Sequence, residues 1–310
     1  MDRAAGAQQS ASGVVPLSAP IADAPPPMRD GPEHRDDPRL RQTNEACAEG
    51  VERVRVVVIS LSGSPRRRRV AEQMADTQLQ WTFFDALRDL QSGQPVYDES
   101  RALRYWGRPL TPSEIGCAAS HIAVLTAVSQ QAEGEWTVVI EDDVFLDPAF
   151  DVTKAIRMCE LAGLGYLRLY GRHLASPVHV VWLGQRELVR FKRAPMGTQA
   201  YLISPMAARN FLGSFRHLDR PIDWEMDRFW ANGLTTYALF PFPCIELSLT
   251  SSVTKYAARS RRPSKADRGF WCLWKSWQWL KRGSANIALH FKDRQLKAIL
   301  SPAPDKCRFG

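Results

Sequence analysis

Three consecutive carboxylates, Glu141-Asp142-Asp143, come directly after the short, mostly apolar run 136–140. Such a run is typical of a buried strand, and the ligands of open parallel sheets bind at the carboxyl ends of strands. Like charges this close repel one another, which favours protonation or a bound cation. Carboxylate oxygens suit Mg²⁺ or Mn²⁺. The pattern predicts a divalent-cation site with Asp143 as the first ligand and Glu141, on the same side of an extended segment, as the second.

The alternative interpretation of these acids is a solvated acidic turn. Under either interpretation, Asp147, which precedes Pro148, is expected to cap the next helix. That helix is expected to end near Gly163.

Four consecutive arginines, 66–69, occupy the first turn of an expected helix. Cations there oppose the helix dipole, so their presence favours an anion bound at the helix N-terminus. The planar guanidinium fork suits a diphosphate, and we expect Arg66 or Arg67 to bind one. The alternative is a solvated basic face that Glu72 and Asp76 partly balance.

These residues need a scaffold, and the hydrophobic pattern predicts an α/β domain with a mostly parallel, Rossmann-like sheet flanked by helices. A capping box at 111–114 starts one helix, and Ser64-Pro65 starts another. The expected strands are 54–61, 81–86 and 136–140, and the expected helices are 65–77, the segment after Thr111, and 147–163.

Composition and charge limit the class of protein. The chain has 310 residues, 45% of them hydrophobic, and a net charge of +8, which excludes an acidic solvating protein without establishing nucleic-acid binding. We expect no membrane span, no secretory signal, and isolated thiols in place of a disulfide framework or a Cys/His zinc site. These features predict a cytoplasmic protein, and we expect no nucleic-acid partner.

The chain is expected to have three parts. Residues 1–50 are rich in Ala, Pro and Asp and predict a disordered tail, followed by a catalytic domain at 51–255. The segment 256–310 is basic and rich in Trp. Its apolar residues recur at helical spacing and predict a helix that lies in the interface of an anionic membrane. The residues of this apolar face are Phe270, Leu273, Trp274, Trp277 and Leu280. The alternative is a helix packed on the catalytic domain.

Five short motifs, taken together and in order, resemble glycosyltransferase family 25, the lipopolysaccharide and lipooligosaccharide galactosyltransferases of Gram-negative bacteria. The likeness covers about 54–254 and leaves out both ends of the chain. The motifs are 58–61 with 65–67 and 83–86, then 110–121, 139–144, 197–204 and 221–223.

The resemblance implies a GT-A fold, a UDP-sugar donor, commonly of galactose, and Mn²⁺ as the usual cation. It also implies inversion at the sugar carbon and a lipid-linked glycan acceptor at the inner face of the cytoplasmic membrane, so that the protein would be peripheral there. Ser60 stands where many members carry Asn, at a position expected to contact the donor.

The resemblance also suggests roles for later residues. Asp223 matches its motif and is the first candidate for the base that accepts the acceptor's proton, ahead of Glu225 and Asp227. An N-cap role is the alternative for Asp223. His121 is expected either to contact donor or acceptor or to be a satisfied core residue.

Gly197 and Thr198 either let the backbone approach the bound sugar or form a plain turn. The principal alternative to a glycosyltransferase is a non-enzymatic basic module that binds RNA or lipid through the Trp-rich segment.

Overall fold

The computed structural model describes residues 54–75, 77–174, 176–247 and 264–301. All of them belong to one unit of the chain, Gln42–Gly310. The expected disordered tail at 1–50 lies outside the described residues, as do 256–263 and 302–310 of the expected basic segment.

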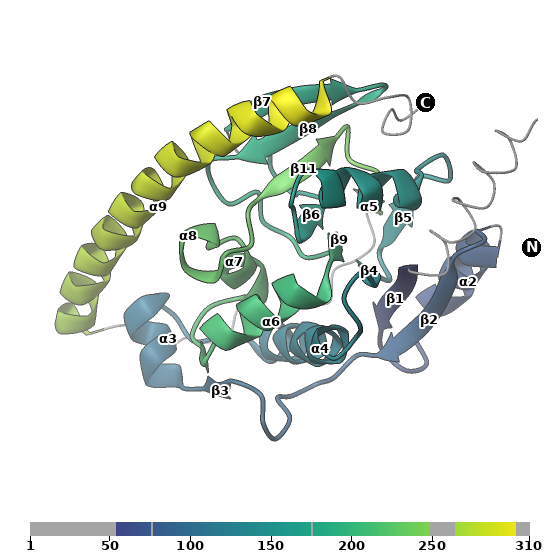
Figure 1. Ribbon diagram of the computed structural model, residues 1–310. Coiled ribbons are helices and arrows are strands. Elements are labelled where there is room, and N and C mark those ends of the chain that lie inside the picture. Colours follow the sequence, from purple (N-terminus) through teal and green to yellow (C-terminus); the bar gives the residue numbers. More distant parts are fainter. Residues whose placement is uncertain (1–53, 76, 175, 248–263, 302–310) are drawn as a thin grey trace, which may run out of the picture. The chain divides into compact units, whose positions relative to one another are not determined.

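An eight-stranded sheet with the order β2-β1-β4-β9-β6-β11-β8-β7 forms the centre of the described structure (Figure 1). Its strands are β1 (Val54–Ser60), β2 (Gln80–Asp85), β4 (Trp136–Glu141), β6 (Tyr166–Arg168), β7 (Pro177–Leu183), β8 (Arg186–Phe191), β9 (Ala200–Ile203) and β11 (Tyr237–Phe240). β2, β1 and β4 run parallel, as does the pair β6–β11. β9 runs antiparallel to both β4 and β6.

The expected α/β class is confirmed, but the sheet is mixed rather than mostly parallel. Part of the antiparallel half is a β7–β8 hairpin, in which Leu183 pairs with Arg186 across a two-residue turn. Gly184 in that turn has a φ of 83°, as tight hairpin turns require. The sequence patterns that predicted the parallel strands do not extend to this hairpin.

β1 and β4 are buried on both faces over most of their length, which explains their nearly continuous apolar sequence, whereas β2 at the edge of the sheet is only partly buried. Val56 and Val58 of β1 belong to a core cluster that includes residues of α2 (Arg66–Ala75) and α5 (Val152–Leu161). Ile59, on the opposite face, belongs to a second cluster that includes residues of α4 (Pro112–Ser129) and α6 (Pro205–Ser214). The helices therefore cover the sheet from two sides.

The remaining elements are short, except for the last helix. They are β3 (Val96–Tyr97), α3 (Glu99–Tyr105), β5 (Val144–Leu146), β10 (His217–Leu218), α7 (Ile222–Met226), α8 (Phe229–Asn232), β12 (Cys244–Glu246) and α9 (Lys265–Leu300).

Two predicted helix starts have different outcomes. The capping box before α4 is confirmed, because the Thr111 side chain accepts from Glu114 N and the Glu114 carboxylate accepts from Thr111 N. The predicted cap at Asp147 is wrong: α5 begins five residues later, and its cap is Asp151, which accepts from Lys154 N. Asp147 instead forms an ion pair with Arg186.

The C-terminal helix α9 runs for 36 residues past α3, α8 and β7 (Figure 1). Its last turns are anchored in the core, where Leu296 and Leu300 are buried. Asp293 accepts hydrogen bonds from Arg190 Nε (2.9 Å) and from the Tyr237 hydroxyl (2.8 Å). The C-terminal end of α9 thus packs on the domain, as the second of the two interpretations of this segment expected.

Other residues of α9 face away from the sheet. The rings of Phe270 and Trp274 both pack edge-on against Tyr105 of α3, so these two predicted membrane-facing residues contact protein. An outward row of apolar side chains remains exposed, and we call it the outer stripe: Leu273, Trp277, Leu280, Ile287 and Phe291. Within the described part of the chain, none of the helices combines the length and apolar character that crossing a bilayer requires.

Candidate active site

The carboxyl ends of the three parallel strands meet at one edge of the sheet. Ser60, at the end of β1, pairs with Asp85 at the end of β2. Ile59 pairs with Glu141 at the end of β4, so the acidic segment starts at the same edge. This is the position at which open α/β sheets bind ligands.

Asp142 holds the acidic loop in place. One of its carboxylate oxygens accepts from the hydroxyls of Ser60 (2.7 Å) and Ser64 (3.0 Å), and the other accepts from Arg66 Nη1 (3.0 Å). Its backbone carbonyl accepts from Arg69 Nη2 at 2.5 Å. The Ser60 hydroxyl, predicted to contact a donor, therefore donates to the protein's own loop. Asp142 is an anchor between the end of β1, the start of α2 and the loop.

Arg66 and Arg67, the two arginines predicted to bind phosphate, diverge from the first turn of α2. Arg66 Nη1 lies 3.0 Å from Asp142 Oδ1 and 4.0 Å from Asp143 Oδ2, so it borders the acidic loop. Arg67 forms an ion pair with Asp85, and its guanidinium lies 4.7 Å from the centre of the Phe83 ring. Asp142 and Asp85 thus compensate the charges of these two arginines. Of the two, Arg66 is the one at the predicted cation site.

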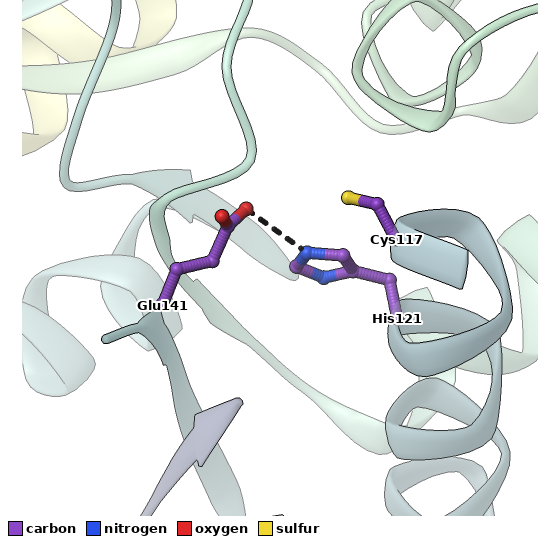
Figure 2. A group of neighbouring side chains, drawn as sticks. All are labelled: Cys117, His121 and Glu141. Atoms are coloured by element: carbon purple, nitrogen blue, oxygen red, sulfur yellow. Dashed lines mark hydrogen bonds and ion pairs between the residues drawn. The ribbon is translucent and has the colours of Figure 1, made fainter. Parts of the chain in front are cut away.

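Glu141 turns toward α4, where it meets His121 and Cys117 (Figure 2). Its Oε1 lies 3.3 Å from His121 Nε2 and accepts from the Thr198 hydroxyl at 3.0 Å. The other ring nitrogen of His121 lies 2.9 Å from the Tyr201 hydroxyl. The structure thus brings together three predicted site residues, Glu141, His121 and Thr198. His121 is buried, and all of its polar atoms have partners.

Cys117 is a residue of this site that the sequence analysis did not single out. It lies one turn before His121 on α4, and the possible ligand atoms of Cys117, His121 and Glu141 all lie within 4.8 Å of one another. The four-residue spacing on one helix was the signal that could have found it. Burial, followed by the charge of Glu141, raises the pKa of Cys117 well above its usual value, so the side chain is a thiol at neutral pH.

Asp143 is the carboxylate with spare binding capacity. Its Oδ1 is buried and has no hydrogen-bond partner among the described residues. Burial first, and then the charges of Glu141 and Glu246, raise the pKa of Asp143 to about 7, while Arg66 lowers it. A buried carboxylate oxygen without a partner, surrounded by further carboxylates, fits a hard divalent cation, which would supply the missing positive charge.

Glu246 joins this group through a strand pair that the sequence analysis did not predict. β12 runs antiparallel to β5, and Glu246 pairs with Val144, the residue after Asp143. The backbone N–H of Leu247 donates to the Asp143 carbonyl at 2.8 Å. Glu246 itself accepts from the Tyr170 hydroxyl at 2.5 Å. A lone acid a hundred residues downstream carries no sequence signal, because only the fold brings it to Asp143.

A tight turn at 196–198 contacts both Glu141, through the Thr198 hydroxyl, and Asp223, through Gly197 N. Met196 and Gly197 both have positive φ, 60° and 83°. A Cβ at Gly197 would lie 2.3 Å from Gln199 Oε1 and 2.8 Å from the Tyr170 ring. Glycine is therefore required here by the backbone conformation and by neighbouring protein atoms, in agreement with the second interpretation, a turn.

A buried ion pair fixes this turn. Arg168 and Asp227 contact each other, and each side chain is only 1% exposed. Arg168 donates to the carbonyls of Met196 and Gly197, while Asp227 accepts from Met196 N at 2.9 Å. The sequence did not predict this pair. Arg168 follows a short apolar run that carries no motif, and Asp227 was considered only as a candidate base. Together they bind the backbone carbonyls and an N–H group of the turn.

The three candidate bases differ in what surrounds them. Asp227 is buried against Arg168, and Glu225, 4% exposed, forms ion pairs with Arg220 and Arg228. Asp223 lies inside the short helix α7 rather than at its N-cap, which is Pro221. It accepts from Gly197 N at 3.2 Å and from Trp224 N at 2.8 Å. Of the three, only Asp223 remains partly accessible and without an arginine partner among the described residues.

Comparison with known proteins agrees with this geometry. No curated protein matches the chain. The model of glycosyltransferase family 25, described as an LPS biosynthesis protein family, matches residues 54–226, which is more than half of the 310 residues. The matched region runs from β1 through α7 and so contains the acidic loop, the 196–198 turn and Asp223. The protein is thus an enzyme rather than a non-enzymatic binding module: it belongs to glycosyltransferase family 25 and is a glycosyltransferase of the LPS-biosynthesis type.

Proposed function

We propose that the enzyme transfers a hexose, with galactose as the first candidate, from a UDP-sugar to a lipid-linked glycan of the lipopolysaccharide type. The observation that carries this proposal is the unpartnered, buried oxygen of Asp143 at the carboxyl edge of the parallel strands. Family membership supports the reaction class. The parallel strands that lead into an acidic loop support a GT-A arrangement.

The proposed cation ligand is Asp143, with Glu246 and Glu141 as neighbouring carboxylates. Mn²⁺ or Mg²⁺ held there would neutralise negative charge on the departing diphosphate. Arg66, which lies 4.0 Å from Asp143, adds positive charge on the same side. Glu141 has fewer free lone pairs than Asp143, because its Oε1 already contacts His121 and Thr198.

Asp223 is the proposed base. The acceptor hydroxyl gives its proton to the Asp223 carboxylate while its oxygen forms a bond to the sugar's anomeric carbon. The attack comes from the face opposite the diphosphate, the bond between that carbon and the diphosphate oxygen breaks, and UDP leaves with the electron pair, so the configuration inverts. The N–H groups of Gly197 and Trp224 orient the carboxylate.

Removal of the metal tests the proposal. We expect the purified enzyme to transfer or hydrolyse a UDP-hexose in Mn²⁺, to lose this activity in excess EDTA, and to regain it when Mn²⁺ is restored. Product formation is measured by chromatography of UDP across a panel of nucleotide sugars. Full activity in EDTA would refute the metal-dependent mechanism, and no activity with any UDP-sugar would refute the donor assignment.

The outer stripe of α9 supports attachment to a membrane surface, where a lipid-linked acceptor resides. Leu273 is 74% exposed and Trp277 is 52% exposed, although both are large apolar residues. Burying such side chains in the membrane interface releases free energy in proportion to their apolar area. The proposed location is therefore peripheral, on an anionic membrane such as the inner face of the cytoplasmic membrane.

Substitution of the stripe tests this attachment. We expect Leu273→Ser/Trp277→Ser to lower binding to phosphatidylglycerol-containing vesicles by about tenfold, since about 1.4 kcal/mol of lost burial suffices. Vesicle flotation measures the bound fraction. The matched control is Val96→Ser/Met206→Ser, which removes two exposed apolar residues elsewhere. Equal binding of both variants would contradict the proposed role of the stripe.

A further inference from the structure

A cavity of about 690 Å³ lies where α9 faces α3, α7 and α8. This volume falls within the roughly 300–1,000 Å³ range of pockets that hold small ligands. Six of the chain's ten tryptophans line it: Trp106, Trp224, Trp230, Trp271, Trp274 and Trp279. Flat aromatic walls with N–H groups at their edges suit the apolar C–H faces and the hydroxyl groups of sugar rings.

The cavity also carries positive charge that no carboxylate in the described part of the chain compensates by an ion pair. Arg220 and Arg228 line it, but both pair with the buried Glu225, at 3.2 and 2.8 Å. Lys275 and Arg282 line it too, and neither forms an ion pair with any of the described carboxylates. No acidic side chain belongs to the described lining.

The surroundings of these two cations are aromatic or basic. Lys275 Nζ lies 3.5 Å from the centre of the Trp271 ring, and the Arg282 guanidinium lies 5.9 Å from that of Trp230. Burial, and then the like charge of Arg193, lower the pKa of Arg282. Arginine stays protonated in proteins, so the cavity retains a positive potential that an anionic ligand would relieve.

The cavity adjoins the proposed base through consecutive residues. Trp224 lines the cavity, and its backbone N–H donates to Asp223 Oδ1 at 2.8 Å. The rings of Trp224 and Trp106 lie 5.1 Å apart, so this part of the wall is continuous. The cavity wall at Trp224 is therefore tied by a hydrogen bond to the carboxylate that accepts the proton in the proposed reaction.

We propose that this cavity binds the acceptor, a glycan with an anionic substituent, through tryptophan faces and the pair Lys275 and Arg282. The inference rests on the proposed transferase function and names the chemical class of its acceptor. Phosphate and carboxylate substituents share the required charge.

The test measures binding of a deacylated lipopolysaccharide core oligosaccharide by calorimetry and by quenching of tryptophan fluorescence. EDTA is present and the donor is absent, so that binding is separated from transfer. We expect Lys275→Gln/Arg282→Gln to raise the Kd about tenfold, because two charge-assisted contacts are lost. The matched control is Arg268→Gln/Lys281→Gln, which removes the same charge from exposed positions of α9 outside the cavity lining. Circular dichroism verifies that both variants are folded.

Two further probes identify the anionic group. The same oligosaccharide is tested after removal of its phosphates and, separately, after reduction of its carboxyl groups. Whichever treatment weakens binding to the wild type, but not to Lys275→Gln/Arg282→Gln, identifies the group. The inference is overturned if the wild type does not bind the oligosaccharide, if both treatments leave its Kd unchanged, or if the two double variants weaken binding equally. Tight, cavity-dependent binding without any sugar transfer would refute the proposed function alone.

Discussion

We expect Asp143→Asn to lower turnover of the UDP-sugar by at least about a hundredfold, since the proposed cation would supply several kcal/mol of charge stabilisation to the departing diphosphate. Asparagine keeps the shape of the side chain, removes its negative charge and replaces one oxygen, a possible metal ligand, by an NH2 group. The buried Oδ1 and the neighbouring charges of Glu141 and Glu246 single out this carboxylate. Initial rates over a range of Mn²⁺ concentrations measure the effect.

The control for this prediction is the same substitution at a structural position. Asp151 caps α5, and asparagine is an equally good N-cap, so Asp151→Asn should leave turnover within about twofold. Saturating Mn²⁺ distinguishes weaker metal binding from a lost chemical role, because it rescues only the first. If Asp143→Asn turned over at the wild-type rate, the acidic loop would not be the catalytic cation site.

The second large effect is expected at the buried ion pair Arg168–Asp227, which contacts the 196–198 turn. We expect Asp227→Asn to lower the free energy of unfolding by about 3–5 kcal/mol, because it leaves the buried charge of Arg168 without an oppositely charged partner. Both side chains are 1% exposed, and the substitution weakens a hydrogen-bond network that reaches Met196 and Gly197. Urea denaturation monitored by circular dichroism measures the loss.

A double variant separates stability from positioning. Replacing a buried ion pair by apolar residues of similar volume is often neutral, so Arg168→Met/Asp227→Leu should recover most of the lost stability. The turn would still lack the contacts of Arg168 to the carbonyls of Met196 and Gly197, so kcat should stay low. A double variant with both full stability and wild-type kcat would show that the pair does not position the turn.

Local sequence signals predicted the first half of the fold well. The apolar runs that form β1 and β4 are buried on both faces, and the capping box before α4 has its two reciprocal hydrogen bonds. Such features depend on neighbours within a few residues. The predicted cap at Asp147 was wrong, because Asp-Pro is a common helix start, whereas the pairing of Asp147 with Arg186 depends on the fold.

The acidic loop lies at the carboxyl ends of the parallel strands, as predicted, but the division of roles within it could not be predicted from the sequence. Three adjacent carboxylates look alike, and they differ only in what the fold places around them. Asp142 is occupied by Ser60, Ser64 and Arg66, while an oxygen of Asp143 has no partner in the described structure. Likewise, Arg66 or Arg67 was predicted to bind a diphosphate, and the sequence could not show that Asp142 and Asp85 lie against these two side chains.

One measurement tests the central claim most directly: the anomalous scattering of Mn²⁺ in crystals grown with MnCl₂ and UDP. The account predicts a single strong manganese peak in contact with the Asp143 carboxylate and with the diphosphate of UDP, at the carboxyl edge of β1 and β4. UDP bound at this edge with Asp143 free of metal, or manganese bound only at another place, would contradict it.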